Sequence, residues 1–200
     1  MQKGTFIFIG RSGCGKGTQA DLLVEYLKAQ SGKDSVFRLE TGKVFRDFIS
    51  KKGYANGIAE GLYEKGELMP EFLSIWVWAE YCIENLKPDQ HMIFDGSPRR
   101  LPEAHAVDSA ISFFNRDDVH VVYLNVSEES AMKRLLARKR LDDNTDDIKA
   151  RMAWFAKDVL PTIAFYKNNP RYNFHEIDGE KTPEEIHSAI MKALALPVAR

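Results

Sequence analysis

Short apolar runs alternate along the chain with longer stretches in which apolar residues recur every three or four positions. This alternation is typical of β-strands that are joined by crossover helices, and it predicts an α/β fold with a parallel sheet. Five runs carry apolar or β-branched residues at successive positions, as strands covered on both faces do. The predicted strands are residues 5–9, 36–39, 91–94, 120–125 and 173–177.

Helices fit the amphipathic stretches between these strands. We predict them at residues 18–30, 43–51, 58–65, 70–86, 102–114, 127–139, 145–167 and 183–196. Pro70, Pro102 and Pro183 suit the first turn of a helix, where the missing N–H costs nothing. Pro161 lies inside the predicted helix 145–167, so a bend is expected near Asp158.

The chain length of 200 residues and a hydrophobic content of 44% suit one domain with a substantial buried core. The chain carries no internal repeat or low-complexity linker, so smaller subdomains can only be insertions between the strands. The segments 42–70 and 138–145 are the candidates, which leaves 1–41, 71–137 and 146–200 as the core.

Bulk properties also exclude several classes of protein. No apolar run approaches the roughly 20 residues that cross a bilayer, and the N-terminus lacks a cleavable signal pattern, so we expect a soluble cytoplasmic protein without a membrane partner. The two cysteines, Cys14 and Cys82, suit a reducing compartment and show no zinc-site spacing. A formal net charge of −1 argues against general affinity for nucleic acid.

A glycine-rich loop follows the first predicted strand directly, with the sequence GRSGCGKGT at residues 10–18. Glycines let backbone N–H groups converge on phosphate oxygens, and the next helix directs its positive end to the same place. Lys16 adds a mobile cation. The pattern favours a polyphosphate site over a turn that only caps a helix, and its binding residues would be Gly13, Cys14, Gly15, Lys16, Gly17 and Thr18.

The common phosphate loop has Ser or Thr directly after its lysine, whereas here Gly17 stands between Lys16 and Thr18. The resulting GKGTQ sequence resembles that of the nucleoside monophosphate kinases, and of the adenylate kinases in particular. The resemblance implies a three-layer P-loop fold and transfer of the terminal phosphoryl of Mg-ATP to a nucleoside monophosphate such as AMP. It also implies Mg²⁺ as the cofactor, nucleotides as the partners, and a monomer.

Three further segments resemble that family in chain order: ETGKVFR at 40–46, KGELMP at 65–70 and DGSPRRLPEA at 95–104. The resemblance implies an acceptor site built from Thr41, Arg46, Glu67, Leu68, Met69, Gly96, Ser97, Pro98, Arg99 and Glu103, with Arg140 and Arg151. Asp95 ends a buried strand beside the loop strand, so we expect it to orient waters on Mg²⁺. The alternative is that Asp95 only caps a helix or lies in a turn.

The basic segment KRLLARKRLDDN at 133–144 resembles a short, metal-free lid. The resemblance implies that Arg134 stacks on the donor base, that Arg138, Arg140 and Arg151 surround the phosphates, and that Lys181 marks the donor base loop. Asp142 and Asp143 would position these arginines. The implied catalytic set is Lys16, Arg99, Arg138, Arg140 and Arg151. Taken alone, the charge run would equally suit a solvated face or a weak nucleic-acid patch.

Several positions depart from the adenylate kinase pattern, notably Ser12, Lys43, Ser97 and Glu103. Glu103 matters most, because the family's Gln both accepts from and donates to adenine, whereas an ionised Glu only accepts. Acceptors such as GMP, CMP or UMP therefore remain alternatives to AMP. A weakly active regulatory protein is a second alternative, and a kinase for a small metabolite such as a sugar or shikimate is a third.

Overall fold

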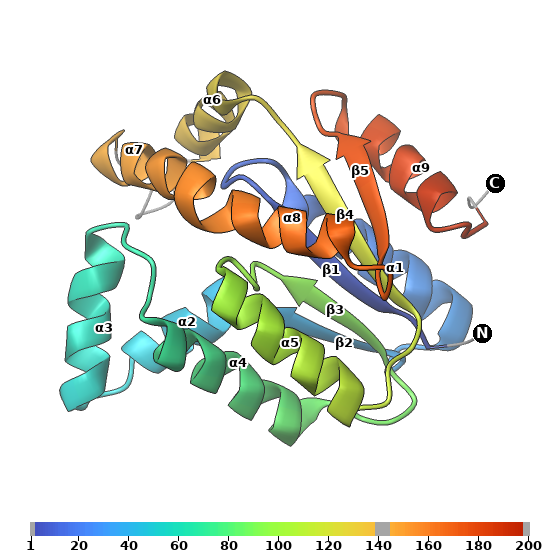
Figure 1. Ribbon diagram of the computed structural model, residues 1–200, viewed down its shortest axis with the longest axis horizontal. Coiled ribbons are helices and arrows are strands. Elements are labelled where there is room, and N and C mark those ends of the chain that lie inside the picture. The colour runs from blue at the N-terminus through green and yellow to red at the C-terminus, as the bar shows by residue number, and fades with distance from the viewer. Residues whose placement is uncertain (1–2, 139–144, 198–200) are drawn as a thin grey trace.

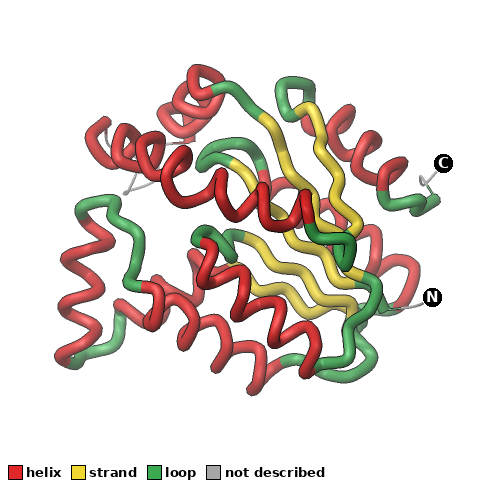
Figure 2. Tube along the Cα trace, in the orientation of Figure 1, coloured by secondary structure: helices red, strands yellow, loops and turns green. Residues whose placement is uncertain are grey.

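The computed structural model describes residues 3–138 and 145–197. Within them, five parallel strands form one sheet (Figures 1 and 2): β1 Thr5–Gly10, β2 Val36–Glu40, β3 His91–Asp95, β4 Val119–Asn125 and β5 Asn173–Asp178. Their order is β2-β3-β1-β4-β5. The expected parallel sheet is confirmed, and every strand end lies within one residue of its predicted place.

Helices cover both faces of the sheet, as crossover connections require. On one face lie α1 Lys16–Ser31, which contacts β1, β2 and β3, and α9 Pro183–Ala193, which contacts α1 and β5. On the other face lie α4 Glu71–Asn85, α5 Leu101–Phe113 and α8 Leu160–Asn168. Figure 2 shows α5 and α8 crossing in front of the strands. No helix within residues 3–138 and 145–197 has the length and apolar character that a membrane span needs.

Alternate residues of the central strand fill the two halves of the core. Phe6 and Phe8 of β1 pack on the side of α1 and α9, while Ile7 and Ile9 pack on the side of α4, α5 and α8. All four side chains are at least 97% buried. Strands buried on both faces explain why the sequence shows continuous apolar runs here.

A smaller apolar cluster holds the segment between β2 and α4. It comprises Phe45 of α2 Thr41–Ile49, Ala59 of α3 Tyr54–Glu64, and Met69, Leu73 and Val77. Both α2 and α3 begin earlier than the predicted residues 43 and 58. The segment therefore packs on the first half of α4 and projects from one end of the sheet (Figure 1).

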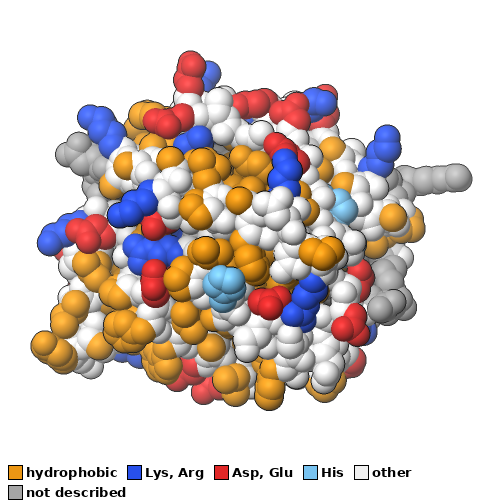
Figure 3. Space-filling model, in the orientation of Figure 1, with side chains coloured by type: hydrophobic (Ala, Val, Ile, Leu, Met, Phe, Trp, Pro, Cys, Tyr) orange, Lys and Arg blue, Asp and Glu red, His pale blue; other side chains and the backbone are white. Residues whose placement is uncertain are grey.

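Hydrophobic side chains also gather on the molecular surface over α2, α3 and α4 (Figure 3). The exposed large side chains of α3 and α4 are Tyr54, Ile58, Phe72, Trp76 and Ile83. None of them is a buried member of the three core clusters. The fold therefore does not depend on their burial.

The predicted long helix 145–167 is divided into three parts. An α-helix, α7 Thr145–Trp154, passes into a π-helical turn, η1 Phe155–Val159, and then into α8. Leu160 N–H donates to Phe155 O, five residues back, and Pro161 follows without an N–H to offer. The irregular turn includes Asp158, near which the sequence predicts a bend.

Because the strands are parallel, all five carboxyl ends meet at one edge of the sheet. There Glu40 lies opposite Asp95, and Phe8 of β1 pairs with the same Asp95. In open α/β sheets, ligands bind outside this edge. The helix α6 Glu128–Arg138 follows β4 at the same edge and completes the surroundings (Figure 1).

Candidate active site

The glycine loop between β1 and α1 packs directly against α6. Gly13 has a φ of +84°, and an added Cβ would lie 2.5 Å from the Ala131 carbonyl oxygen and 2.8 Å from Leu135 Cγ. Gly15 has a φ of +98° and caps the N-terminus of α1. The loop therefore lies around the positive end of α1, which is suited to an anion.

We expect Gly13→Ala to lower the free energy of unfolding by about 3 kcal/mol, because the new methyl group meets backbone as well as an unfavourable φ. Gly15→Ala is the matched control. Its φ is equally positive, but nothing lies within 4 Å of the added Cβ, so a loss of about 1 kcal/mol is expected. Urea denaturation of both variants measures the difference, and equal losses would contradict the packing account.

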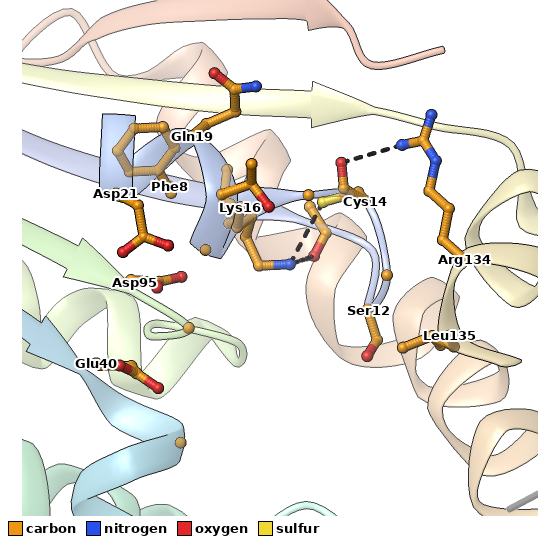
Figure 4. A pocket seen from close by; sticks show the side chains of 18 of the residues that line it. Phe8, Ser12, Cys14, Lys16, Gln19, Asp21, Glu40, Asp95, Arg134 and Leu135 are labelled. Atoms are coloured by element: carbon orange, nitrogen blue, oxygen red, sulfur yellow. Dashed lines mark hydrogen bonds between the residues drawn. The ribbon is translucent and has the colours of Figure 1, made fainter. Parts of the chain in front are cut away.

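Lys16 folds back onto the loop from the first turn of α1. Its Nζ donates to Gly10 O at 2.8 Å and to Arg11 O at 2.9 Å, with Cys14 Sγ at 3.5 Å (Figure 4). These acceptors carry partial charges, so the full charge of the ammonium is available to an anion. The loop thus holds a cation at the site that the sequence assigns to a polyphosphate.

A cavity of about 660 Å³, the larger cavity, opens at this edge of the sheet. Arg134 forms part of its wall by joining two loops, since its Nη2 donates to Gly179 O at 2.8 Å and its Nη1 to Cys14 O at 3.4 Å. The lining includes every residue predicted to bind the donor: Gly13, Cys14, Gly15, Lys16, Gly17, Thr18, Arg134, Arg138 and Lys181.

Asp95 also faces the larger cavity, but its carboxylate is already paired. Its Oδ2 accepts a hydrogen bond from Arg38 Nη2 at 2.7 Å, and Arg38 also pairs with Asp21 of α1. Burial lowers the pKa of the Arg38 guanidinium, but the hydrogen bonds and charges of Asp95 and Asp21 outweigh this, so the pKa is raised. The predicted metal carboxylate thus has a resident cationic partner.

A second cavity of about 150 Å³, the smaller cavity, lies against α2, α4 and α5. Its lining includes Thr41, Arg46, Glu67, Leu68, Met69, Ser97, Arg99, Glu103 and Arg151 of the predicted acceptor set, whereas Gly96 and Pro98 line the larger cavity. Arg140 lies outside the described residues, as do Asp142 and Asp143. Thr41 Oγ1 is buried and has no hydrogen-bond partner within the described ranges, so a ligand could satisfy it.

The two cavities share a wall of cationic side chains. Arg46, Arg99 and Arg138 line both, and Arg151 lines the smaller one. Arg99 Nε donates to Gly96 O at 2.9 Å, which fixes the side chain between the cavities. Burial lowers the pKa of Arg99, and the charge of Arg151 lowers it further, whereas Glu103 and Asp95 raise it. Anionic groups placed here would relieve this repulsion.

Glu103 is 3% exposed and lines the smaller cavity. Its Oε2 accepts from the Arg99 backbone N–H at 3.0 Å. Burial raises the pKa of this carboxyl, although the Arg99 N–H, the Arg99 charge and the Ser74 hydroxyl each favour the ionised form. The protonated form of Glu103, which can donate as well as accept, is thus favoured more than in a solvent-exposed glutamate.

Sequence reasoning missed several residues of the site, among them Arg38, Ser74 and Trp154. Arg38 lies between the buried Phe37 and Leu39, so the alternation in the strand shows that it faces the other side of the sheet. The alternation does not show which residues it pairs with. Ser74 is a polar break in an apolar helix, which was a usable signal. Trp154 lines both cavities, and its Nε1 donates to Gly66 O at 3.4 Å; its pattern was that of an ordinary core residue.

The chain resembles known proteins over the whole of this site. The family model described as adenylate kinase matches residues 8–171. The adenylate kinase of Thermus thermophilus is 30% identical over 194 residues, which cover 95% of this chain and 96% of that protein. The adenylate kinase of Phocaeicola vulgatus is 31% identical over 192 residues (94% and 96%), and that of Prochlorococcus marinus is 33% identical over 175 residues (87% and 90%). A chain that carries the phosphate loop, the paired cavities and this likeness over almost its full length belongs to the adenylate kinase family.

Proposed function

We propose that this protein catalyses the reversible transfer of the terminal phosphoryl of Mg-ATP to AMP, which yields two ADP. One observation carries the proposal: the cavity at the phosphate loop and the smaller cavity share a wall that contains Arg46, Arg99 and Arg138. A donor in one cavity and an acceptor in the other would meet at these cations. The relatives that match almost the whole chain are adenylate kinases.

The residues present can perform this transfer without a nucleophile or base of their own, because a phosphate oxygen of the acceptor attacks. Lys16 and the loop N–H groups would hold the donor phosphates. Arg99, Arg138 and Arg151 would hold the acceptor phosphate and the transferring group in line. Arg140 is assigned the same role by resemblance alone.

Mg²⁺ fits the residues beside the loop. Asp95 offers carboxylate oxygens, the donor type that Mg²⁺ prefers, and it is buried at the cavity wall. Gly17 leaves space there that a side chain would fill, since an added Cβ would lie in van der Waals contact with Asp95 Oδ2, at 3.6 Å. Asp95 would hold the ion through water, and the ion would supply charge that neutralises the donor phosphates.

The two insertions between the strands are proposed to bind the acceptor and to close over the bound nucleotides. Segment 42–70 supplies Glu67, Leu68 and Met69 to the smaller cavity, which supports an acceptor-binding role. Segment 138–145 is the proposed lid; only its two ends lie among the described residues. One chain lines both cavities, which supports a monomer as the working form. The proposed compartment is the cytoplasm, which suits the two free cysteines.

A coupled assay of ADP formation with Mg-ATP and each of AMP, GMP, CMP and UMP tests the proposal. Rapid transfer to AMP is expected. Preference for another monophosphate would contradict the assignment of AMP as the acceptor but would leave the assignment as a phosphotransferase standing. Nucleotide binding without transfer to any of the four would favour the regulatory alternative.

Glu103 makes acceptor choice depend on pH. A neutral carboxyl donates and accepts, which matches the ring nitrogen and amino group of adenine, whereas a carboxylate matches the adjacent donors of guanine. We therefore expect kcat/KM for AMP to fall, and that for GMP to rise, as pH rises through the raised pKa of Glu103. Glu103→Gln is expected to remove this dependence and to lower GMP use about tenfold or more.

Steady-state kinetics with both nucleotides over the whole pH range in which the enzyme stays folded measure this effect. The ratio of variant to wild type removes the titration of the nucleotide phosphate, which both proteins share. Glu67→Gln is the control, because this carboxylate lies at the same cavity but is exposed. An unchanged pH profile in Glu103→Gln would refute the role of Glu103.

A further inference from the structure

Arg38 lies in β2 and reaches the donor site, whereas the residues on either side of it point to the other face of the sheet. Phe37 and Leu39 are buried on the side of α4, so Arg38 faces α1 on the opposite side of the sheet. It pairs in register with Ile93, and Asp95 lies two residues further along the same face of β3. The side chain thus runs along the sheet toward its carboxyl edge and lines the larger cavity.

The contacts of Arg38 tie it to three points around the site. Nη2 is 2.7 Å from Asp95 Oδ2 and 3.3 Å from Gly17 O, and the Nη1 end pairs with Asp21. The Asp21 side chain is 62% exposed, but those of Asp95 and Arg38 are only 9% and 20% exposed. The pair with Asp95 is therefore the less screened of the two, and the stronger.

We propose that Arg38 is a resident counter-ion of Asp95 that competes with the divalent cation for this carboxylate and so sets the metal affinity of the donor site. The inference rests on the proposed function, since it assumes the Mg-nucleotide site at Asp95. A divalent cation that approaches Asp95 meets a positive charge already beside the carboxylate oxygen, so repulsion offsets part of the attraction. Without the metal, the guanidinium neutralises a buried carboxylate that would otherwise repel the donor phosphates.

Arg38 is thus a positioning residue that acts on the metal through Asp95. A purely structural role is the competing account, in which the ion pairs only join α1 to β2 and β3. The two accounts differ in sign. Loss of a competing cation tightens metal binding, whereas loss of a structural tie weakens the site or leaves the metal affinity unchanged.

Mn²⁺ binding tests the proposal by a measurement separate from activity. Mn²⁺ is titrated into the full-length protein saturated with a non-hydrolysable ATP analogue, and free Mn²⁺ is followed by electron paramagnetic resonance. Arg38→Gln is expected to bind Mn²⁺ about tenfold more tightly than wild type, because one opposing charge is gone. Arg38→Lys keeps the charge and is expected to stay within about threefold of wild type.

Arg11→Gln is the matched control. It removes one positive charge from the phosphate loop, where Arg11 pairs with Glu128 at 3.4 Å rather than with Asp95. It is expected to change the Mn²⁺ affinity less than Arg38→Gln does. An equal shift would overturn the proposal, since it would reflect net charge and not competition at Asp95.

The remaining outcomes distinguish a failure of the role of Arg38 from a failure of the proposed kinase function. Unchanged or weaker Mn²⁺ binding in a folded Arg38→Gln protein overturns the role of Arg38 and leaves the kinase function standing. If Arg38→Gln fails to fold, Arg38→Met takes its place, because it also removes the charge: tighter Mn²⁺ binding than in wild type supports the proposal, and unchanged or weaker binding overturns it. A wild-type protein that binds no Mn²⁺ with the analogue overturns the proposed donor site and this inference together.

Discussion

Lys16→Met is expected to slow phosphoryl transfer about a thousandfold, the largest effect of any single substitution considered. The methionine keeps much of the side-chain volume but removes the cation that the loop carbonyls of Gly10 and Arg11 now hold. The free energy of unfolding should change by no more than about 1 kcal/mol, because only hydrogen bonds from a part-buried side chain are lost.

The coupled ADP assay and urea denaturation measure these two quantities. Lys28→Met is the matched control, since it removes the same charge from the exposed last turn of the same helix. Its rate should stay within about twofold of wild type. A comparable loss in both variants, or a fast Lys16→Met enzyme, would show that the loop does not hold the reacting phosphates.

Arg99→Lys is expected to lower kcat by about a hundredfold although it preserves the charge. The planar fork of arginine can bind phosphate through two parallel hydrogen bonds while Nε stays on Gly96 O. A lysine cannot do both. The Arg99 guanidinium also lies 5.4 Å from the centre of the ring of Trp154, which lines both cavities, and an ammonium cannot stack on that ring as a planar guanidinium can.

Arg100→Lys provides the comparison at the neighbouring position. Arg100 donates to Met69 O at 3.2 Å and lies 3.3 Å from Asp158, and it lines neither cavity. We expect less than a tenfold change in kcat for this variant, with a modest loss of stability. Equal effects at Arg99 and Arg100 would mean that the first substitution acts through folding and not through the phosphates.

The strands were predictable from the sequence because their signal is local. Each is a short apolar run between polar segments, and burial on both faces admits little else. Helix beginnings were less predictable. Residues 54–57 of α3 include polar and glycine positions that read as a turn, yet packing of Ala59 and Met69 stabilises the helix around them. Tertiary contacts, which no local window contains, decided these ends.

The residues of the site also fall into those with a local signal and those that depend on tertiary contacts. The loop, Asp95 and Arg99 lie in short motifs whose spacing carries their chemistry, so the sequence alone brings them forward. Arg38 and Trp154 act through partners 57 and 88 residues away, Asp95 and Gly66. Such pairs arise only when the strands and helices have packed. Of Arg38, Ser74 and Trp154, only Ser74, a polar residue in an apolar helix, carried a visible signal in the sequence.

The order of the strands also sets when the site can form during folding. The phosphate loop ends β1 and Asp95 ends β3, and these strands pair through Thr5 with Met92, far apart in the chain. Helices such as α1 and α4 can begin to form from local contacts, but closing so long a loop carries a large entropic cost that only sheet pairing repays. Recovery of activity after refolding therefore reports completion of the sheet, whereas recovery of helical circular dichroism reports an earlier event.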